Sequence, residues 1–189
     1  MGFFDEIIDP AWLAPSPTAL PEPPWLGPPH DVRAIQLPIE LDFVRTSDLA
    51  LWISGATVFP SGITFDLQVR WGRARRVALP LLVGDRGRGG LCLGVAFDDG
   101  RRALAVPRRR QLRQREPQQS LVATTLRARP YQTTNEIWMW PLPAESLTWV
   151  LEWRAQQVAE SRVRFTADGL ADAARRARPV WSVPAPAVN

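Results

Sequence analysis

Apolar and polar residues alternate along much of the chain, which is the pattern of strands with one buried face. The alternation is most regular in ITFDLQVRW, residues 63–71, where every second side chain from the isoleucine onward is apolar. A similar pattern spans 35–43, where Pro38 favours an edge strand or a bulge because proline has no amide hydrogen to donate. A further strand is predicted at 49–53 and resumes at 56–59. The sequence therefore predicts an extensive β-sheet.

Residues 91–97 continue the strand pattern, with large apolar side chains on one face and small Cys, Gly and Ala on the other. The small face allows another group to approach closely. Asp-Asp-Gly at 98–100 supplies turn residues, and 101–106 is predicted to be the hairpin partner. Residues 107–119 are predicted to form a polar, basic loop, and a strand is predicted near 121–127.

The stretch IWMWPLPAESLTWVLEW, residues 137–153, contains four tryptophans and follows a turn-rich segment at 129–135. Its pattern predicts two strands joined by a hairpin loop of ordinary length, with Trp149 and Trp153 on one face of the second strand. Aromatic residues at alternate positions either fill a core or form an exposed stacking platform. The core is expected, because large rings contribute strongly to burial.

The C-terminal part combines a short strand at 161–165 with a helix at about 167–178. Thr166 is the expected N-cap, an alanine-rich stripe recurs at helical spacing, and Pro179 ends the helix. We expect this helix to dock against the sheet and Trp181 to anchor the tail.

Residues 1–30 form an extended arm in which proline follows proline, so neither a helix nor a strand ladder can persist. Two interpretations remain open. The arm packs along its own domain and covers a sheet edge, or it reaches a partner. In the second case its large apolar side chains are the contact residues. These are Phe3, Phe4, Trp12 and Trp25.

About eight or nine strands with one late helix predict a mainly β protein. The expected architecture is an antiparallel β-sandwich or a barrel-like sheet, with one C-terminal α-helix and an extended proline-rich N-terminal arm. In this division the arm is 1–30, a single domain spans 31–183, and a frayed tail covers 184–189.

Three stretches, ATVFPSGITFDLQVRW, LCLGVAFDDGRRA and WMWPLPAESLTWVLEW running on through ADAARRARPVW, resemble a family of uncharacterised proteins from actinobacteria-like, high-GC bacteria. Together they cover about half of the chain, all of it after the arm. The resemblance implies a shared fold and a bacterial cytoplasmic origin. It implies no activity and no site residues, because that family has none assigned.

Composition adds three departures from the ordinary: 19 prolines, 9 tryptophans, and 23 basic residues that are all arginine. A GC-rich coding genome accounts for the choice of arginine without a functional cause. The net charge of +4 permits an anionic partner without requiring one. One cysteine, an acidic N-terminus and the lack of a long apolar stretch predict a soluble, cytoplasmic protein without a membrane partner.

Residues with catalytic chemistry are scarce. The single histidine, His30, lies beside an aspartate on the arm, where a solvated role is expected. Cys92 lies in a strand pattern that favours burial, and one Cys with one His cannot complete a zinc site. Asp98 and Asp99 fit a turn better than a cation site, and the glycine-rich loop at 84–90 lacks the P-loop Lys-Ser/Thr. No catalytic residue, metal ligand or cofactor is therefore predicted.

Arginine clusters are the strongest functional feature, and the densest lies in the loop 107–116. Its members are Arg108, Arg109, Arg110, Arg113 and Arg115. Such a cluster neutralises phosphates in polyanion-binding proteins, although it also suits a simple solvated surface. No recognition helix or aromatic RNA-binding motif accompanies it, so any binding of nucleic acid would be nonspecific.

The leading functional hypothesis is a non-enzymatic protein–protein interaction module, or an assembly subunit of a bacterial complex, that binds another protein or itself through the arm. Nonspecific binding of nucleic acid or another polyanion through the loop 107–116 is the first alternative. The second is a carboxylate-dependent hydrolase, which requires two facing carboxylates in a pocket.

Overall fold

The computed structural model describes residues 22–74, 90–113 and 115–181. Its strands are β1 (Val32–Arg33), β2 (Ile35–Leu37), β3 (Leu41–Arg45), β4 (Leu49–Val58), β5 (Ile63–Trp71), β6 (Cys92–Phe97), β7 (Arg102–Pro107), β8 (Ser120–Arg129), β9 (Gln132–Trp140), β10 (Leu147–Trp153), β11 (Val158–Phe165) and β12 (Arg178–Pro179). Its helices are α1 (Arg108–Gln111), the 3-10 turn η3 (Arg154–Gln156) and α2 (Leu170–Arg176).

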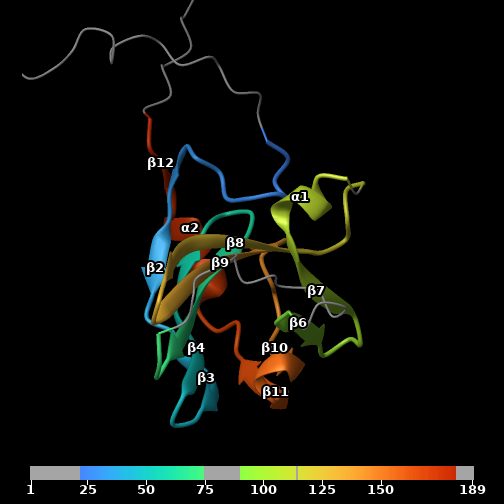
Figure 1. Cartoon of the computed structure of the whole chain (residues 1–189). Helices are drawn as coiled ribbons and strands as arrows, with labels where there is room; N and C mark the ends of the chain where they lie inside the picture. Colours follow the sequence, from blue (N-terminus) through green and yellow to red (C-terminus); the bar gives the residue numbers. More distant parts are fainter. Residues whose placement is uncertain (1–21, 75–89, 114, 182–189) are drawn as a thin grey trace, which may run out of the picture.

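Ten of the strands form one curled sheet in the order β11-β10-β6-β7-β8-β9-β5-β4-β2, with β3 also paired to β4 (Figure 1). Neighbours are antiparallel except β7 and β8, which run parallel. β7 pairs with β6 through its first half and with β8 through its second half, so it joins the two halves of the sheet. The remaining pair, β1 with β12, joins the segment that precedes the large sheet to the segment that follows α2.

The inner face of the curled sheet encloses one large apolar core. Phe65 of β5 lies at its centre, with its ring 5.0 Å from that of Trp149 and 5.3 Å from that of Phe165, both edge to face. Phe65 and Trp149 are completely buried. Helix α2 adds Leu170 and Ala173 to the same core. Edge-to-face aromatic packing stabilises such a core beyond the burial of apolar area alone.

The predicted fold class is confirmed: the protein is mainly β, with a curled, half-barrel sheet. The alternation at 63–71 corresponds to β5, whose inward side chains are fully buried up to Val69. The two pieces predicted at 49–53 and 56–59 belong to one strand, β4, with a bulge between Ile53 and Ala56. The single strand predicted at 35–43 is two strands, β2 and β3, with Pro38 in the break between them. β2 lies at the edge of the sheet, as the missing donor of Pro38 predicts.

The predicted hairpin within 137–153 is wrong. β9 pairs with β5 and β8, whereas β10 pairs with β6 and β11, so the connection carries the chain from one half of the sheet to the other. The amide of Leu142 donates to the carbonyl oxygen of Ser61 (3.1 Å) and directs this crossing. Trp149 and Trp153 are buried in the main core as expected.

Two segments predicted as irregular are partly ordered. Residues 132–135 of the turn-rich segment belong to β9, because Thr133 and Asn135 face inward opposite Val69 and Leu67 of β5. The basic loop begins with one helical turn, α1. Its Gln111 is buried and thereby fixes the turn on the domain.

The C-terminal helix is shorter than predicted. α2 begins after Gly169, which has a left-handed φ of 77°, rather than after Thr166. The expected anchor Trp181 is 68% exposed. Among the described residues, no helix is long and apolar enough to cross a membrane.

Candidate functional site

The base of the arm, residues 22–26, packs on the outer face of the sheet. The indole Nε1 of Trp138 donates to the carbonyl oxygen of Pro24 (2.9 Å), and the hydroxyl of Ser120 donates to that of Trp25 (2.8 Å). Leu26 is 4% exposed. Because this proline-rich segment does not pair as a strand, its backbone carbonyl groups lack strand partners. Side chains of β8 and β9 donate hydrogen bonds to these carbonyl groups instead.

An aromatic cluster lies beneath this segment. Trp138, Phe59 and Val122 form a second small core on the face of the sheet opposite the main one. The rings of Trp138 and Phe59 meet edge to face at 5.6 Å. Trp25 of the arm packs over Trp140, with ring centroids 6.1 Å apart. Residues 22–26 are therefore anchored on the domain by both apolar and polar contacts.

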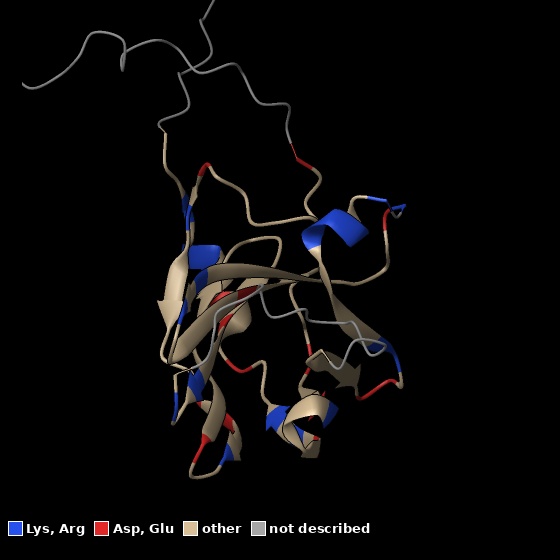
Figure 2. Cartoon of the chain, in the orientation of Figure 1, with Lys and Arg blue, Asp and Glu red and all other residues tan. Residues whose placement is uncertain are grey.

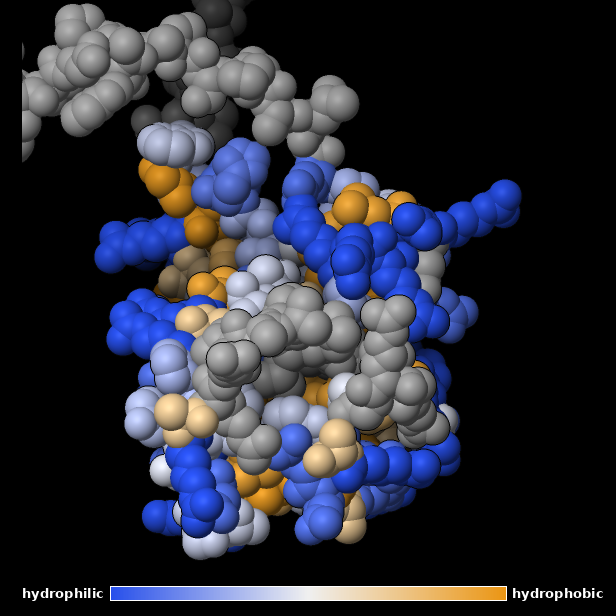
Figure 3. All heavy atoms as spheres, viewed as in Figure 1, coloured by the Kyte–Doolittle hydropathy of each residue, from blue (hydrophilic) through white to orange (hydrophobic). Residues whose placement is uncertain are grey.

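Helix α1 lies directly beside the arm base. Arg108, its first residue, forms an ion pair with Glu22 of the arm. Leu112, which follows the helix, is 59% exposed. We call the combined surface of 22–26 and 108–113 the arm-base surface. Figure 2 shows basic residues concentrated on α1, and Figure 3 shows an apolar patch bordered by hydrophilic residues at this end of the molecule.

The remaining arginines of the cluster are free of the rest of the described chain. Arg109, Arg110, Arg113 and Arg115 are all exposed. None of the ion pairs within the described ranges involves any of them. Four arginines without an ion-pair partner in the described ranges thus lie close in sequence to the exposed Leu112.

Both ends of the described chain emerge at the same end of the molecule (Figure 1). β1 pairs with β12, and the amide of Val180 donates to the carbonyl oxygen of Asp31 (2.7 Å). Val180 and Trp181 are both largely exposed.

The predicted arm residues have different outcomes. Phe3, Phe4 and Trp12 lie outside the described residues. Trp25 is half-buried on its own domain, so residues 22–26 pack along the domain as the first interpretation of the arm predicts. They lie over β8 and β9, inside the sheet order, rather than over a sheet edge. The predicted arginines are brought together around α1, with Arg108 already paired to Glu22. Sequence reasoning missed Glu22 and Leu112, because only the fold brings Glu22 to Arg108 and leaves Leu112 exposed.

Other residues considered for chemistry occupy ordinary positions. His30 is exposed on the arm. Asp99 closes the β6–β7 turn by accepting hydrogen bonds from the backbone amide (3.0 Å) and the side chain of Arg101. These hydrogen bonds lower the pKa of the Asp99 carboxyl. Asp98 pairs with Arg164 (3.0 Å). Among the described residues, no group of three or more His, Cys, Asp or Glu could hold a metal ion. Of the glycine-rich loop, only Gly90 lies within the described residues.

A shallow groove of about 160 Å³ lies on the outer face of β6, β7, β10 and β11. Gly94 forms its floor, and a Cβ there would lie 2.7 Å from the carbonyl oxygen of Ala103. Leu104 and Val150 are apolar walls, and charges of both signs surround them. The small side chains on one face of β6 were predicted to let another group approach closely. Part of that approach is made by the neighbouring strand β7. Half-buried Cys92 lines the same groove.

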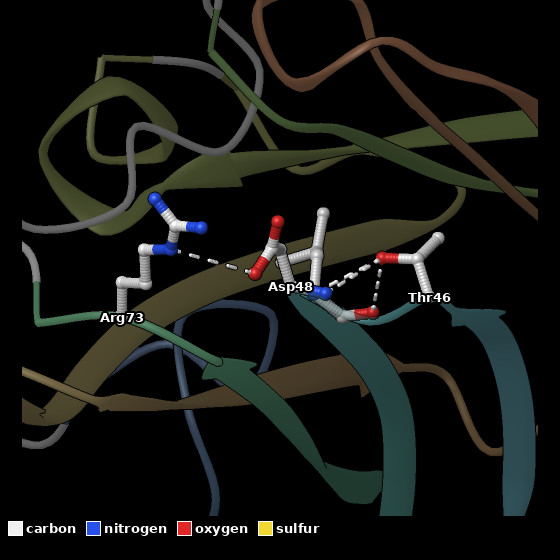
Figure 4. A network of polar contacts seen from close by, with 4 residues as sticks. Thr46, Asp48 and Arg73 are labelled. Atoms are coloured by element: carbon white, nitrogen blue, oxygen red, sulfur yellow. Dashed lines mark hydrogen bonds and ion pairs between the residues drawn. The ribbon is translucent and has the colours of Figure 1, made fainter.

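A larger cleft of about 420 Å³ opens where the two edges of the curled sheet meet. The hydroxyl of Ser161 on β11 donates to the carbonyl oxygen of Phe43 on β3 (2.9 Å), and the cleft widens beside this contact. Thr46 shapes its rim by accepting from the amides of Asp48 and Leu49 (Figure 4). Arg73 lies 3.9 Å from the Asp48 carboxylate, and both groups are exposed.

One pair of carboxylates faces the same side of the sheet. Asp66 of β5 lies directly opposite Glu136 of β9. Burial raises the pKa of both, and the negative charge of Asp66 raises that of Glu136 further. Side chains at opposite positions of neighbouring strands project in parallel rather than across a cleft. The pair lines neither of the two clefts above. The hydrolase alternative, which requires two facing carboxylates in a pocket, stays a prediction.

No family model, curated protein or solved structure matches this chain. The resemblance to a high-GC bacterial family therefore stays a prediction, and the site has to be interpreted from its own geometry.

Proposed function

We propose that this protein is a non-enzymatic interaction module that binds another protein through the arm-base surface and the arm that leaves it. The observation that carries the proposal is the packing of residues 22–26 against β8, β9 and α1. This packing fixes the point from which the rest of the arm departs. It also sets that point beside an exposed leucine and uncompensated arginines.

The chemistry of this surface defines the partner. Arginine is enriched at protein interfaces because its planar group binds carboxylates in pairs of hydrogen bonds, and an aliphatic anchor beside it gains from burial. Leu112 supplies the anchor, and Arg109, Arg110 and Arg113 supply the donors. The partner segment is therefore acidic and carries at least one large apolar side chain. A cytoplasmic location is part of the proposal, consistent with the single cysteine.

Site-specific photo-crosslinking tests this proposal in cells that express the protein. A photoreactive amino acid replaces Leu112 in one variant and Leu126, a comparably exposed leucine of β8, in the control. We expect a protease-sensitive, nuclease-resistant adduct from position 112 and none from position 126. Equal labelling from both positions, or none from either, would contradict an interface at α1.

Binding of a polyanion is the second candidate function, and the four exposed arginines favour it. Such binding releases counterions, so its affinity falls steeply as salt increases. Replacing Arg109, Arg110, Arg113 and Arg115 by Gln should abolish binding to a heparin column and reduce the salt slope for a DNA duplex. A flat salt response, or an adduct at position 112 that contains only protein, would exclude this candidate.

A further inference from the structure

We infer that the arm-base surface binds the acidic N-terminal segment of a second copy of this chain. The inference rests on the proposed function and names its partner. The occupant is residues 3–9, FFDEIID, and the receiving surface is Leu112 with the exposed arginines around it. Association is then reciprocal, because each copy has one such segment and one such surface.

Charge complementarity is the first argument. The segment holds three acids, which we call the N-terminal acids: Asp5, Glu6 and Asp9. Three exposed arginines near Leu112, which we call the docking arginines, have no ion pair within the described chain: Arg109, Arg110 and Arg113. The arm already uses this chemistry once, because Glu22 binds Arg108 at the edge of the same surface.

Apolar complementarity is the second argument. Phe3, Phe4, Ile7 and Ile8 give the segment large side chains between and beside its acids. Leu112 is an exposed leucine at the receiving end, with Gln111 buried beneath it. Burying a phenylalanine or isoleucine against such an anchor removes apolar area from water on both sides.

The length of residues 10–21 favours a second copy over the same one. Residues 10–21 separate the segment from Glu22 and contain four prolines. A proline-rich segment of this length extends over about 37 Å at about 3.1 Å per residue. The docking arginines, by contrast, follow closely in sequence on Arg108, the ion-pair partner of Glu22. Binding within one chain would require the ends of residues 10–21 to return to the same place, whereas a neighbouring copy receives the segment anywhere within the reach of these twelve residues.

Charge reversal in the full-length protein tests this arrangement. In one variant each N-terminal acid becomes Arg, and in the other each docking arginine becomes Glu. In each variant alone the segment and the surface carry like charges. We expect the dissociation constant for self-association, measured by sedimentation velocity, to rise at least about tenfold in each.

Mixing the two variants decides between copies. In the mixture the basic segment of one variant faces the acidic surface of the other, and the acidic segment faces the basic surface. Association should therefore return on mixing, and also in a chain that carries both sets of changes. A control with Arg127→Glu and Arg129→Glu on β8 should associate as the original protein does. Failure to recover on mixing, or a monomeric original protein at all concentrations, would overturn the inference.

Failure of the self-association test can be distinguished from failure of the proposed interaction function. A monomeric protein that still forms the position-112 adduct with another protein refutes the second copy as partner and leaves the interaction function standing. A protein without any adduct at position 112 refutes the interface itself.

Discussion

The indole Nε1 of Trp138 donates a 2.9 Å hydrogen bond to the carbonyl oxygen of Pro24, which lies 114 residues earlier in the chain. Trp138 is almost completely buried, so its donor has no access to water once the arm base is in place. A segment rich in proline is thus held by side chains that compensate for its missing ladder. The arm base is part of the domain.

Replacing Trp138 by Phe should lower the free energy of unfolding by about 2 kcal/mol, since it removes this hydrogen bond and part of the buried ring. It should also speed limited proteolysis near Trp25. Trp52→Phe is the matched control, because Trp52 is only half-buried on the same strand-rich domain. Urea unfolding measures both variants. Equal losses in the two would indicate that the Pro24 contact does not hold the arm base.

Gly62 is required because strand β9 approaches its backbone closely. A Cβ at this position would lie 2.5 Å from the carbonyl oxygen of Met139 and 2.5 Å from the ring of Trp138. Gly62→Ala should therefore destabilise the fold by about 1–3 kcal/mol. Gly55, at the bulge of β4, has open space around it, so Gly55→Ala should be neutral or slightly stabilising. Thermal unfolding compares them, and a tolerated Gly62→Ala would contradict the packing described.

The pair of Asp66 and Glu136 gives stability an unusual pH dependence. Because the folded state raises both pKa values, it binds these protons more tightly than the unfolded state does. The pair stabilises the fold below the ordinary carboxyl pKa values, and that contribution is lost as the pH rises through the raised values. At neutral pH the two like charges oppose each other across neighbouring strands.

Glu136→Gln should accordingly raise the free energy of unfolding at neutral pH by about 0.5 kcal/mol, a figure reduced for partial solvent screening. The gain should disappear in acid, where both carboxyls are protonated. Glu145→Gln, on an exposed connection, serves as the control. Unfolding curves across the acidic and neutral range test this, and a gain that persists unchanged in acid would contradict it.

Local pattern was enough to predict individual strands. The alternation of 63–71 specifies a strand and its inner face without further information, because period two follows from the geometry of an extended chain. Interruptions of these patterns were visible only in part, since glycine and proline act locally but do not specify the kind of irregularity. The predicted break within 49–59 is a bulge in β4, and the predicted edge or bulge at Pro38 is a break between β2 and β3. The mainly β fold followed from these elements.

Strand pairing was not predictable in the same way. Around 137–140 apolar residues occupy both parities, so the sequence left open which face Trp138 adopts. The structure buries Ile137 in the main core and Trp138 in the smaller one beneath the arm. The crossing between β9 and β10 depends on contacts with β5 and β6. The opposition of Asp66 and Glu136 depends on register. Neither can be inferred from spacing along the chain.

The hydroxyl of Ser161 donates to the carbonyl oxygen of Phe43 across the seam between β11 and β3. These two edges share no strand ladder among the described pairings, so a single side chain satisfies a backbone acceptor that a neighbouring strand would otherwise bind. Ser161→Ala should cost about 1 kcal/mol and lower Tm by about 2–4 °C. Ser54→Ala, which removes an exposed contact with Gln68, should change Tm by less than about 1 °C. Calorimetry separates them: if both variants melt together with the original protein, the seam is held by core packing alone and the Ser161 bond contributes nothing to closure.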